Sequence, residues 1–544
     1  MNEMILPFTL PSYIIYETET ARFEGRFDNG AVMKRNVRVE LVPQEDGTGA
    51  EIRIGSPDTG LRWVKLRFPT ELFQGCRILG DAWERGYGDL EWRGISARRI
   101  LPWYFLACSH SAMTYGIGVK VRPDALCFWE ADPKGLTLFL DVRCGGEGVH
   151  LSGRTLHAAT LIGVAYDGIS PFEAGRAFCR AMCTDPHLPP NPVYGSNNWY
   201  YAYGKSSREE ILKDTAYLSD LAQGFINRPY MVIDDGWQMH HRLNDYNGGP
   251  WRGGNAAFKD MGSLAGEMSE MGVIPGIWFR PLLNESTDLP ASGRLAGGFL
   301  DPTVPETLSY IKEDVQTICG WGFRLIKHDF STFDLFGRWG FEMNPLITKD
   351  GWHFQDRSVT SAEVVKLLYR VIFETAGQAE ALVLGCNTIG HLGAGLMHLS
   401  RTGDDTSGRE WERTRCMGIN SLAFRLSHHG SFYSVDADCV GITSSIPWEY
   451  NRQWADLIAR SGTALFVSVK PDSLDREQRR ELSGSLKMAS EGLHHATPLD
   501  WMESDCPQIW EDDGKVCRYD WYEKAGADFA LDAKRFEPYL NSLY

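Results

Sequence analysis

From residue 196 to residue 492 the chain alternates between short apolar runs and longer amphipathic stretches. The runs are apolar along most of their length, as expected for parallel strands that helices cover on the outside. The amphipathic stretches, such as Ser207–Gly224 and Ser361–Gly377, repeat apolar residues with the period of a helix. In chain order the predicted strands are Ser196–Tyr201, Pro229–Asp235, Val273–Phe279, Phe323–Asp329, Ala381–Asn387, Leu396–Asp405, Ser431–Asp438 and Ala464–Lys470.

These eight runs and the helical stretches between them predict an α/β fold. Eight strand–helix units over about 300 residues are typical of a (β/α)8 TIM barrel. Further helices are predicted near Met261–Met271, Pro305–Gly322 and Asp475–Gly492. A doubly wound open sheet is the structural alternative, but it would usually bring a glycine-rich phosphate turn after its first strand. The sequence shows no such turn there.

Residues 1–184 follow a different pattern and predict a β-sandwich. Short alternating runs, among them Val37–Pro43 and Leu136–Val142, are separated by Gly, Asp and Pro turns. A helix over Pro171–Cys183 and the proline-rich segment Asp185–Gly195 follow, and such a stiff segment is typical of a domain boundary. The predicted domains are therefore an N-terminal β-sandwich (1–184), a catalytic barrel (185–492) and a small C-terminal β domain (493–544).

Composition narrows the classes of partner. The 544 residues carry a formal charge of −16 with acidic residues spread along the chain, which argues against nucleic acid and anionic membranes. No apolar stretch reaches the roughly 18 residues of a membrane span. The N-terminus lacks a basic segment and is interrupted by Pro7 and Pro11, so no signal peptide is predicted. The twelve cysteines have no repeating spacing, which indicates buried free thiols and a cytoplasmic location.

Candidate chemistry gathers at the predicted strand ends, where barrel enzymes carry their active residues. Carboxylates accept hydrogen bonds from sugar hydroxyls, and aromatic rings cover the apolar faces of sugars. The pattern therefore favours a pocket for an oligosaccharide or glycoside, with no cofactor and no metal. The strand-end residues are Trp199, Tyr200, Asp234, Asp235, Trp278, Lys327, Asp329, Cys386, Asn387, Arg401, Asp405, Asp436 and Asp438.

Two of the carboxylates are candidates for catalysis. Lys327 and Asp329 alternate on one strand and are expected to point into the pocket together, with the lysine holding Asp329 ionised as a nucleophile. Asp405 is the candidate acid/base, and like charges such as Asp404 are expected to raise its pKa. Arg401, four residues earlier, is expected to orient the substrate or tune this acid. A strand-end salt bridge remains the alternative for each residue alone, but several strand ends together favour a site.

The segments WYY, VIDDGWQ, GIWF, LIKHD and RTGDDT, in this order, resemble glycoside hydrolase clan D. This clan contains the α-galactosidases (melibiases) and α-N-acetylgalactosaminidases, and the layout is most similar to family 36. The resemblance implies that Asp329 is the nucleophile and Asp405 the acid/base of a retaining exo-α-galactosidase, with carboxyl groups roughly 5–5.5 Å apart. It implies that Asp234 and Asp235 bind the O4 and O6 hydroxyls of galactose. It further implies that Trp199, Trp278, Lys327 and Arg401 line the −1 subsite and that Cys386 lies near the 2- or 3-hydroxyl.

Three positions depart from the pattern of the family. His328 stands inside the K-x-D segment, where strand alternation predicts that it points away from Asp329 and packs. Arg280 follows GIWF, and the stretch after Cys386 reads NTIGHLGAG. Asn387 and His391 are expected where the substituent at C2 of the sugar is read, so galactose and N-acetylgalactosamine both stay open.

Other functions are compatible with the same residues. Within the clan, a transglycosidase is a variant of the same chemistry. A catalytically inactive carbohydrate-binding homologue would lack the nucleophile or the acid, and both candidates are present. A metal-dependent hydrolase would use Asp234 and Asp235 with Asp436 and Asp438, since carboxylates alone can hold Mg²⁺. The sequence is compatible with a homo-oligomer and does not specify the oligomeric state.

Overall fold

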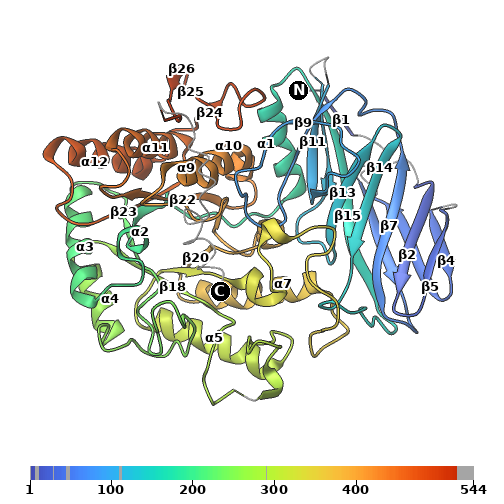
Figure 1. Ribbon diagram of the computed structural model, residues 1–544, viewed down its shortest axis with the longest axis horizontal. Coiled ribbons are helices and arrows are strands. Elements are labelled where there is room, and N and C mark those ends of the chain that lie inside the picture. The colour runs from blue at the N-terminus through green and yellow to red at the C-terminus, as the bar shows by residue number, and fades with distance from the viewer. Residues whose placement is uncertain are drawn as a thin grey trace.

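The computed structural model describes residues 2–5, 11–27, 30–44, 49–109, 113–289 and 291–523. Its centre is a closed barrel of eight parallel strands, shown on the left of Figure 1. The first strand pairs with both the second and the eighth, so the predicted (β/α)8 barrel is confirmed and an open sheet is excluded. The strands are β16 (Tyr194–Asn197), β17 (Tyr230–Ile233), β18 (Ile274–Phe279), β19 (Leu325–His328), β20 (Leu382–Gly385), β21 (Leu399–Arg401), β22 (Ser434–Ile442) and β23 (Ala464–Val469).

The barrel helices begin at capping side chains that the sequence supplies. Ser207 caps α3, Thr360 forms a capping box with Glu363 at α7, and Asp475 forms one with Gln478 at α12. Their apolar faces pack on the barrel, which gives the outer ring of helices in Figure 1. The long barrel helices are α3 (Arg208–Leu221), α4 (Met261–Glu270), α5 (Pro305–Gly320), α7 (Ser361–Gly377), α11 (Trp448–Ser461) and α12 (Arg476–Glu491).

The first barrel strand ends earlier than the sequence predicts. Strand β16 stops at Asn197, and the WYY segment forms a short helix, α2 (Trp199–Ala202). The side-chain oxygen of Asn197 accepts a hydrogen bond from the backbone N–H of Trp199 at 2.8 Å, a local turn that competes with the strand. Trp199 and Tyr200 therefore lie beyond the strand, above the barrel mouth.

Two antiparallel sheets precede the barrel and form the predicted β-sandwich, on the right of Figure 1. Phe105 of one sheet and Trp129 of the other have ring centroids 6.3 Å apart, in the core between the sheets. One sheet contains β1 (Asn2–Ile5), β4 (Ala31–Lys34), β5 (Val37–Pro43), β6 (Gly49–Gly55), β8 (Arg77–Gly80), β9 (Arg93–Gly94), β11 (Tyr104–Cys108), β12 (Thr114–Val119) and β15 (Thr155–Asp167). The other contains β2 (Tyr13–Thr18), β3 (Arg22–Arg26), β7 (Leu61–Pro69), β10 (Leu101–Pro102), β13 (Leu126–Asp132) and β14 (Gly135–Asp141).

The sandwich is joined to the barrel mouth by the loop between β8 and β9. Within it, the N–H of Gly86 donates to the carbonyl of Thr402 at 2.7 Å, and the N–H of Asp404 donates to the carbonyl of Gly86 at 3.0 Å. A buried ion pair between Asp81 and Arg425, at 2.7 Å, ties the same loop down. The loop thus runs beside the segment that follows β21 and brings side chains of the sandwich to the barrel mouth.

After the barrel, a three-stranded antiparallel sheet comprises β24 (Thr497–Pro498), β25 (Ile509–Asp512) and β26 (Lys515–Arg518). Two tryptophans join this C-terminal segment to the barrel: Trp501 donates to the carbonyl of Ala423 at 2.9 Å, and Trp411 donates to the carbonyl of Trp521 at 2.7 Å. The predicted C-terminal domain is therefore a β element that depends on the barrel, as far as its described residues show. Residues 524–544 lie outside the described residues.

All twelve cysteines are free thiols, and ten of them are buried. The prediction of buried free thiols is confirmed for these ten, while Cys416 and Cys517 are partly exposed. In the ranges that the structure describes, no helix is long and apolar enough to cross a membrane.

Candidate active site

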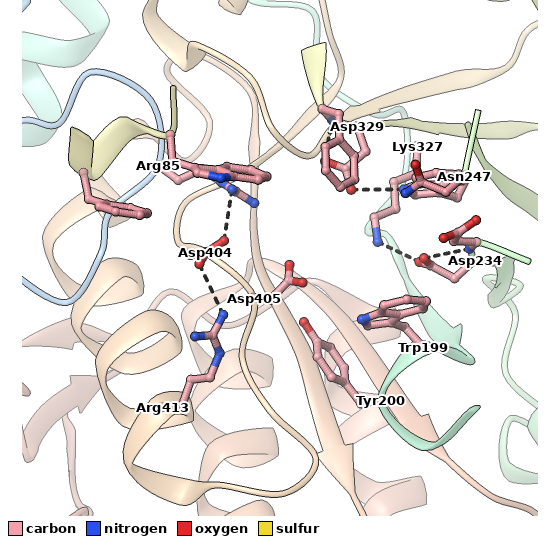
Figure 2. Close-up of a pocket in the computed structure, with 15 residues that line it drawn as sticks. Arg85, Trp199, Tyr200, Asp234, Asn247, Lys327, Asp329, Asp404, Asp405 and Arg413 are labelled. Carbon is pink, nitrogen blue, oxygen red and sulfur yellow. Dashed lines mark hydrogen bonds and ion pairs between the residues drawn. The ribbon is translucent and has the colours of Figure 1, made fainter. Parts of the chain in front are cut away.

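A pocket opens at the C-terminal ends of the barrel strands (Figure 2). The pocket and its open mouth enclose about 770 Å³. Eight of the thirteen strand-end residues predicted from the sequence line it: Trp199, Tyr200, Asp234, Asp235, Trp278, Lys327, Asp329 and Asp405. The strand ends thus converge on one cavity, and five aspartates lie on its wall once Asp404 is included.

One side of the pocket is a fixed array of carboxylates. Asp234 accepts hydrogen bonds from Lys327 Nζ at 2.8 Å and from Asn197 Nδ2 at 2.6 Å. Burial would lower the pKa of Lys327, but the Asp234 carboxylate outweighs this effect and holds that pKa above its ordinary value. Burial raises the pKa of Asp235 to about 7, with Asp234 adding to the rise, while Gln238 donates to Asp235 at 2.7 Å.

Asp329 stands immediately after β19 and is held by two donors. Trp278 Nε1 donates to one carboxyl oxygen at 3.0 Å, and the backbone N–H of Phe330 donates to the other at 2.7 Å. Lys327 and Asp329 do share one side of the strand, but the ammonium group of Lys327 is bound to Asp234. The hydrogen-bond donors of the Asp329 carboxylate are therefore an indole and a backbone N–H, which fix its orientation, while Lys327 interacts with Asp329 only through its charge.

Asp405 lies across the pocket from this array (Figure 2). Its carboxylate accepts a hydrogen bond from Arg401 at 3.2 Å, and its side chain keeps 41% of its accessible surface because it faces the pocket. Crowding by protein atoms raises the pKa of Asp405, but Arg401, Arg85, Lys327 and Arg413 outweigh it, and the pKa is lowered. The prediction of a raised pKa in the free protein is therefore wrong, because nearby cations rather than like charges dominate.

Arg401 does not line the pocket and lies behind Asp405. It is 2% exposed and pairs with Asp438 at 3.0 Å as well as with Asp405. Asp438 also accepts hydrogen bonds from the hydroxyl of Tyr200 and, at 2.7 Å, from the backbone N–H of Thr406. Arg401 therefore positions Asp405 and lowers its pKa. It is buried behind the pocket wall and not placed to contact a sugar directly.

Cys386 and Asn387 also stand outside the pocket. Cys386 is 1% exposed and its sulfur lies 3.3 Å from Arg401. Both amide atoms of Asn387 are used, since Oδ1 accepts from the N–H of Phe333 at 3.0 Å and Nδ2 donates to Glu84. The predicted sugar contacts are therefore replaced by supporting roles, because Cys386 contacts Arg401 of the barrel and Asn387 is held by Glu84 of the sandwich.

The three positions that depart from the family pattern are buried outside the pocket lining. His391 stacks on Trp103 of the sandwich at 5.0 Å, so it does not read a sugar substituent. His328 is fully buried and bonds the hydroxyl of Ser331 at 2.9 Å, as strand alternation predicts. Arg280 pairs with Asp334 at 2.5 Å and donates to Asn247 at 2.5 Å, which fixes a residue of the pocket wall.

The sandwich contributes a residue that sequence reasoning missed. Arg85, from the loop between β8 and β9, lines the pocket and is 3% exposed. It pairs with Glu84 at 2.8 Å and with Asp404 at 3.0 Å, and Asp404 also pairs with Arg413 at 3.2 Å. Figure 2 shows Arg85, Asp404 and Arg413 on the side of Asp405 away from Lys327. No local sequence signal marks Arg85, because long-range contacts such as the bridge between Gly86 and Gly403 bring it there.

The other missed residues come from long strand-to-helix loops. Asn247 follows β17, while Phe330, Trp339 and Phe341 follow β19, and all four line the pocket. Trp339 stacks on Phe333 at 4.6 Å and lies under the Arg85 guanidinium at 5.5 Å. For the three aromatic residues, a position in a long loop after a barrel strand was a sequence signal for a place in the pocket wall.

Two of the four carboxylates named for a metal-dependent alternative are paired with cations, while Asp235 accepts from the Gln238 amide and Asp436 from the backbone N–H of Asp438. Asp234 is paired with Lys327, and Asp438 with Arg401. Within the described ranges, no group of three or more His, Cys, Asp or Glu side chains is arranged to hold a metal ion. The site thus has the layout of a carboxylate pocket with aromatic walls.

Comparison with known proteins gives the fold a context. No protein-family model and no curated protein sequence matches the chain. Among solved structures, the α-galactosidase TtGalA from Thermus thermophilus, in complex with p-nitrophenyl α-D-galactopyranoside, is similar over 95% of this chain and 99% of its own, at 16% identity and a TM-score of 0.59. The chain has the fold of GH36 α-galactosidases.

Two further structures agree. A variant of the GH36 α-galactosidase AgaA from Geobacillus stearothermophilus, in complex with 1-deoxygalactonojirimycin, matches over 94% of this chain and 76% of its own, at 14% identity and a TM-score of 0.58. The galactosidase domain of the α-galactosidase-sucrose kinase AgaSK matches over 97% of this chain and 79% of its own, at 15% identity and a TM-score of 0.56. The arrangement of sandwich, barrel and C-terminal sheet is thus that of this fold family.

Proposed function

We propose that the protein is a retaining exo-α-galactosidase that removes a terminal α-linked galactose from an oligosaccharide or glycoside. The observation that carries the proposal is the pair Asp329 and Asp405, which line one pocket from different strand ends. Retaining glycosidases use two carboxyl groups in this way, one as nucleophile and one as acid and base. The fold shared with GH36 α-galactosidases supports the choice of sugar.

In the first step Asp329 attacks the anomeric carbon of the bound sugar, and the bond to the glycosidic oxygen breaks. Trp278 Nε1 and the N–H of Phe330 hold the Asp329 carboxylate, so the nucleophile is oriented before the substrate arrives. Asp405 gives a proton to the departing oxygen. A water molecule then gives its proton to Asp405 and attacks the glycosyl-enzyme, which releases Asp329 and a sugar of retained configuration.

The proton on Asp405 depends on substrate binding. In the free protein, Arg401 and the other nearby cations keep the pKa of Asp405 low even though protein atoms crowd it. A sugar that fills the pocket removes water from the exposed 41% of this side chain, and loss of water raises the pKa of a carboxyl group. Asp405 therefore carries its proton in the complex with the sugar and is ionised in the empty pocket.

At the other side, Asp234 and Asp235 are placed to bind sugar hydroxyls. Asp234 lines the pocket and is held by Lys327, Asn197 and the backbone N–H of Asp235, so this carboxylate has a fixed position. Asp235, with a pKa of about 7, can donate as well as accept near neutral pH. Such fixed polar groups reject a sugar whose hydroxyl points elsewhere, because a buried group would then lose its partner.

The test is a panel of 4-nitrophenyl glycosides with the purified full chain. We expect release from the α-galactoside, little from the β-galactoside and α-glucoside, and an α-configured sugar as the first product by NMR. The α-N-acetylgalactosaminide in the panel addresses the substituent at C2. Release from neither α-galactoside nor α-N-acetylgalactosaminide, or a β-configured first product, would refute the proposal.

A further inference from the structure

A second cavity lies beside the active site, on the same face of the barrel. It is formed by the loops that follow β22 and β23, together with the end of α2, and encloses about 1200 Å³ with its open mouth. Tyr200, 3% exposed, belongs to the walls of both cavities and separates them. The residues that matter here are Tyr203, Arg409, Trp448, Asn451 and Lys470. The proposed hydrolysis uses none of these five residues.

The charge of this cavity is opposite to that of the active site. Among the described residues its lining contains Arg409 and Lys470 but no carboxylate, whereas five aspartates line the active site. Both cations are exposed, and neither has an ion-pair partner among the described residues. In a chain with a formal charge of −16, two unpaired cations on one cavity wall favour an anionic group.

Asn451 supplies the second, independent observation. Its side chain is 1% exposed and lines the cavity, yet neither its amide nitrogen nor its amide oxygen has a hydrogen-bond partner among the described residues. Leaving a buried polar group unsatisfied costs about 1–3 kcal/mol, so such a group normally meets a ligand or a water molecule. An amide that can donate and accept suits a hydroxyl group, which does both.

The helix termini around the cavity are not equivalent. Helix α12 is capped by Asp475, whose carboxylate accepts from the backbone N–H groups of Glu477 and Gln478. Helix α11 begins after Pro447 without any side-chain cap, and Trp448 and Asn451 of its first turn line the cavity. An uncapped helix N-terminus favours an anion, and the loops after strands seven and eight are a frequent phosphate site in barrels. Glu449, in the same turn, is exposed and does not line the cavity.

We propose that this cavity binds a saccharide that carries an anionic group, a phosphate or a carboxylate. The anion lies between Arg409, Lys470 and the start of α11, and a hydroxyl group meets the amide of Asn451. The half-buried ring of Trp448 covers the apolar face of the sugar. The Arg409 guanidinium lies over the ring of Tyr203 at 4.2 Å, which holds the cation at the cavity wall.

The test is isothermal titration calorimetry of the full chain with four probes: galactose 6-phosphate, galacturonate, galactose and inorganic phosphate. Saturating 1-deoxygalactonojirimycin, which the AgaA variant binds, keeps the active site of a galactosidase occupied. We expect one of the two anionic saccharides to bind at least tenfold more tightly than galactose and than inorganic phosphate. Which one binds distinguishes a phosphate from a carboxylate.

Variants locate the binding. Arg409→Gln and Lys470→Gln should each weaken binding by about tenfold, whereas Lys213→Gln, an exposed lysine of α3 that lines neither cavity, should not change it. Turnover of 4-nitrophenyl α-galactoside should be unchanged in all three variants. The turnover assay therefore distinguishes loss of this binding site from failure of the proposed hydrolysis. Equal binding of galactose, equal binding of inorganic phosphate, or affinity that neither Arg409→Gln nor Lys470→Gln reduces would overturn the proposal.

Discussion

Replacing Asp405 with alanine should separate substrates by their leaving groups. A general acid contributes about 10²–10⁴-fold, or roughly 3–5 kcal/mol at 1.36 kcal/mol per tenfold, when the departing oxygen needs a proton. An oligosaccharide should lose activity by that factor. 4-Nitrophenolate is stable without a proton, so formation of the glycosyl-enzyme from its α-galactoside should change by less than about tenfold.

The structure indicates that this loss is chemical and not a loss of folding. Asp405 is 41% exposed, and the side chain that it binds, Arg401, keeps its buried partner Asp438 at 3.0 Å. Removal of a pair this exposed changes the free energy of unfolding by about 1 kcal/mol or less. Urea denaturation of the variant should therefore give a midpoint close to that of the unchanged protein.

The assay compares initial rates on raffinose-type oligosaccharides and on 4-nitrophenyl α-galactoside, with and without azide. Azide attacks the glycosyl-enzyme without needing a base, so it should restore turnover in Asp405→Ala and yield α-galactosyl azide. Asp404→Ala is the matched control, because Asp404 is the neighbouring pocket carboxylate and pairs with Arg85 and Arg413. Equal loss on both substrates with no azide product, or leaving-group discrimination in Asp404→Ala instead, would refute the acid role of Asp405.

Three further outcomes are expected. Lys327→Met leaves the buried carboxylate of Asp234 without its cation, so the free energy of unfolding should fall by about 3 kcal/mol in urea titrations, and a change below 1 kcal/mol would contradict this pairing. Arg85→Gln removes one cation that lowers the pKa of Asp405, so the basic limb of the kcat profile, which reports the substrate complex, should move to higher pH, and an unmoved limb would count against the coupling. The pKa of Asp235 is about 7 in the folded protein and near 4 in the unfolded chain, so the stability that this group contributes is lost as pH rises from 4 to 7. In denaturant titrations, Asp235→Asn should raise the free energy of unfolding by at most about 4 kcal/mol relative to the unchanged protein at pH 8 and by nothing at pH 4. An equal gain at both pH values would exclude this titration.

The barrel was predictable because its signals are local. Strand-length apolar runs, helical periodicity and capping residues such as Thr360 and Asp475 lie within single elements. The core of the site followed from strand alternation, which puts Lys327 and Asp329 on one side. The end of β16 did not follow, because a side-chain hydrogen bond of Asn197 decides it.

The parts of the site that depend on contacts between domains were not predictable from the sequence. Arg85 reaches the pocket through backbone pairing of Gly86 with Gly403, and Asn387 is turned away because Glu84 binds its amide. The pKa of Asp405 is lowered mainly by Arg401, four residues earlier in the sequence, and Arg85 of the sandwich adds to this effect through a contact that the strand pattern does not predict. The sequence predicts which side chains are neighbours along one strand. It does not predict which charged side chains from another domain lie beside them.

The central claim, that Asp329 forms a covalent bond to the sugar, can be measured directly. The full chain is incubated with an activated fluorinated α-galactoside, digested with a protease and sequenced by mass spectrometry. We predict that the glycosyl mass is found on the peptide with Asp329 and is absent in Asp329→Ala. A label on Asp405, or no label on a protein that hydrolyses α-galactosides, would contradict the mechanism.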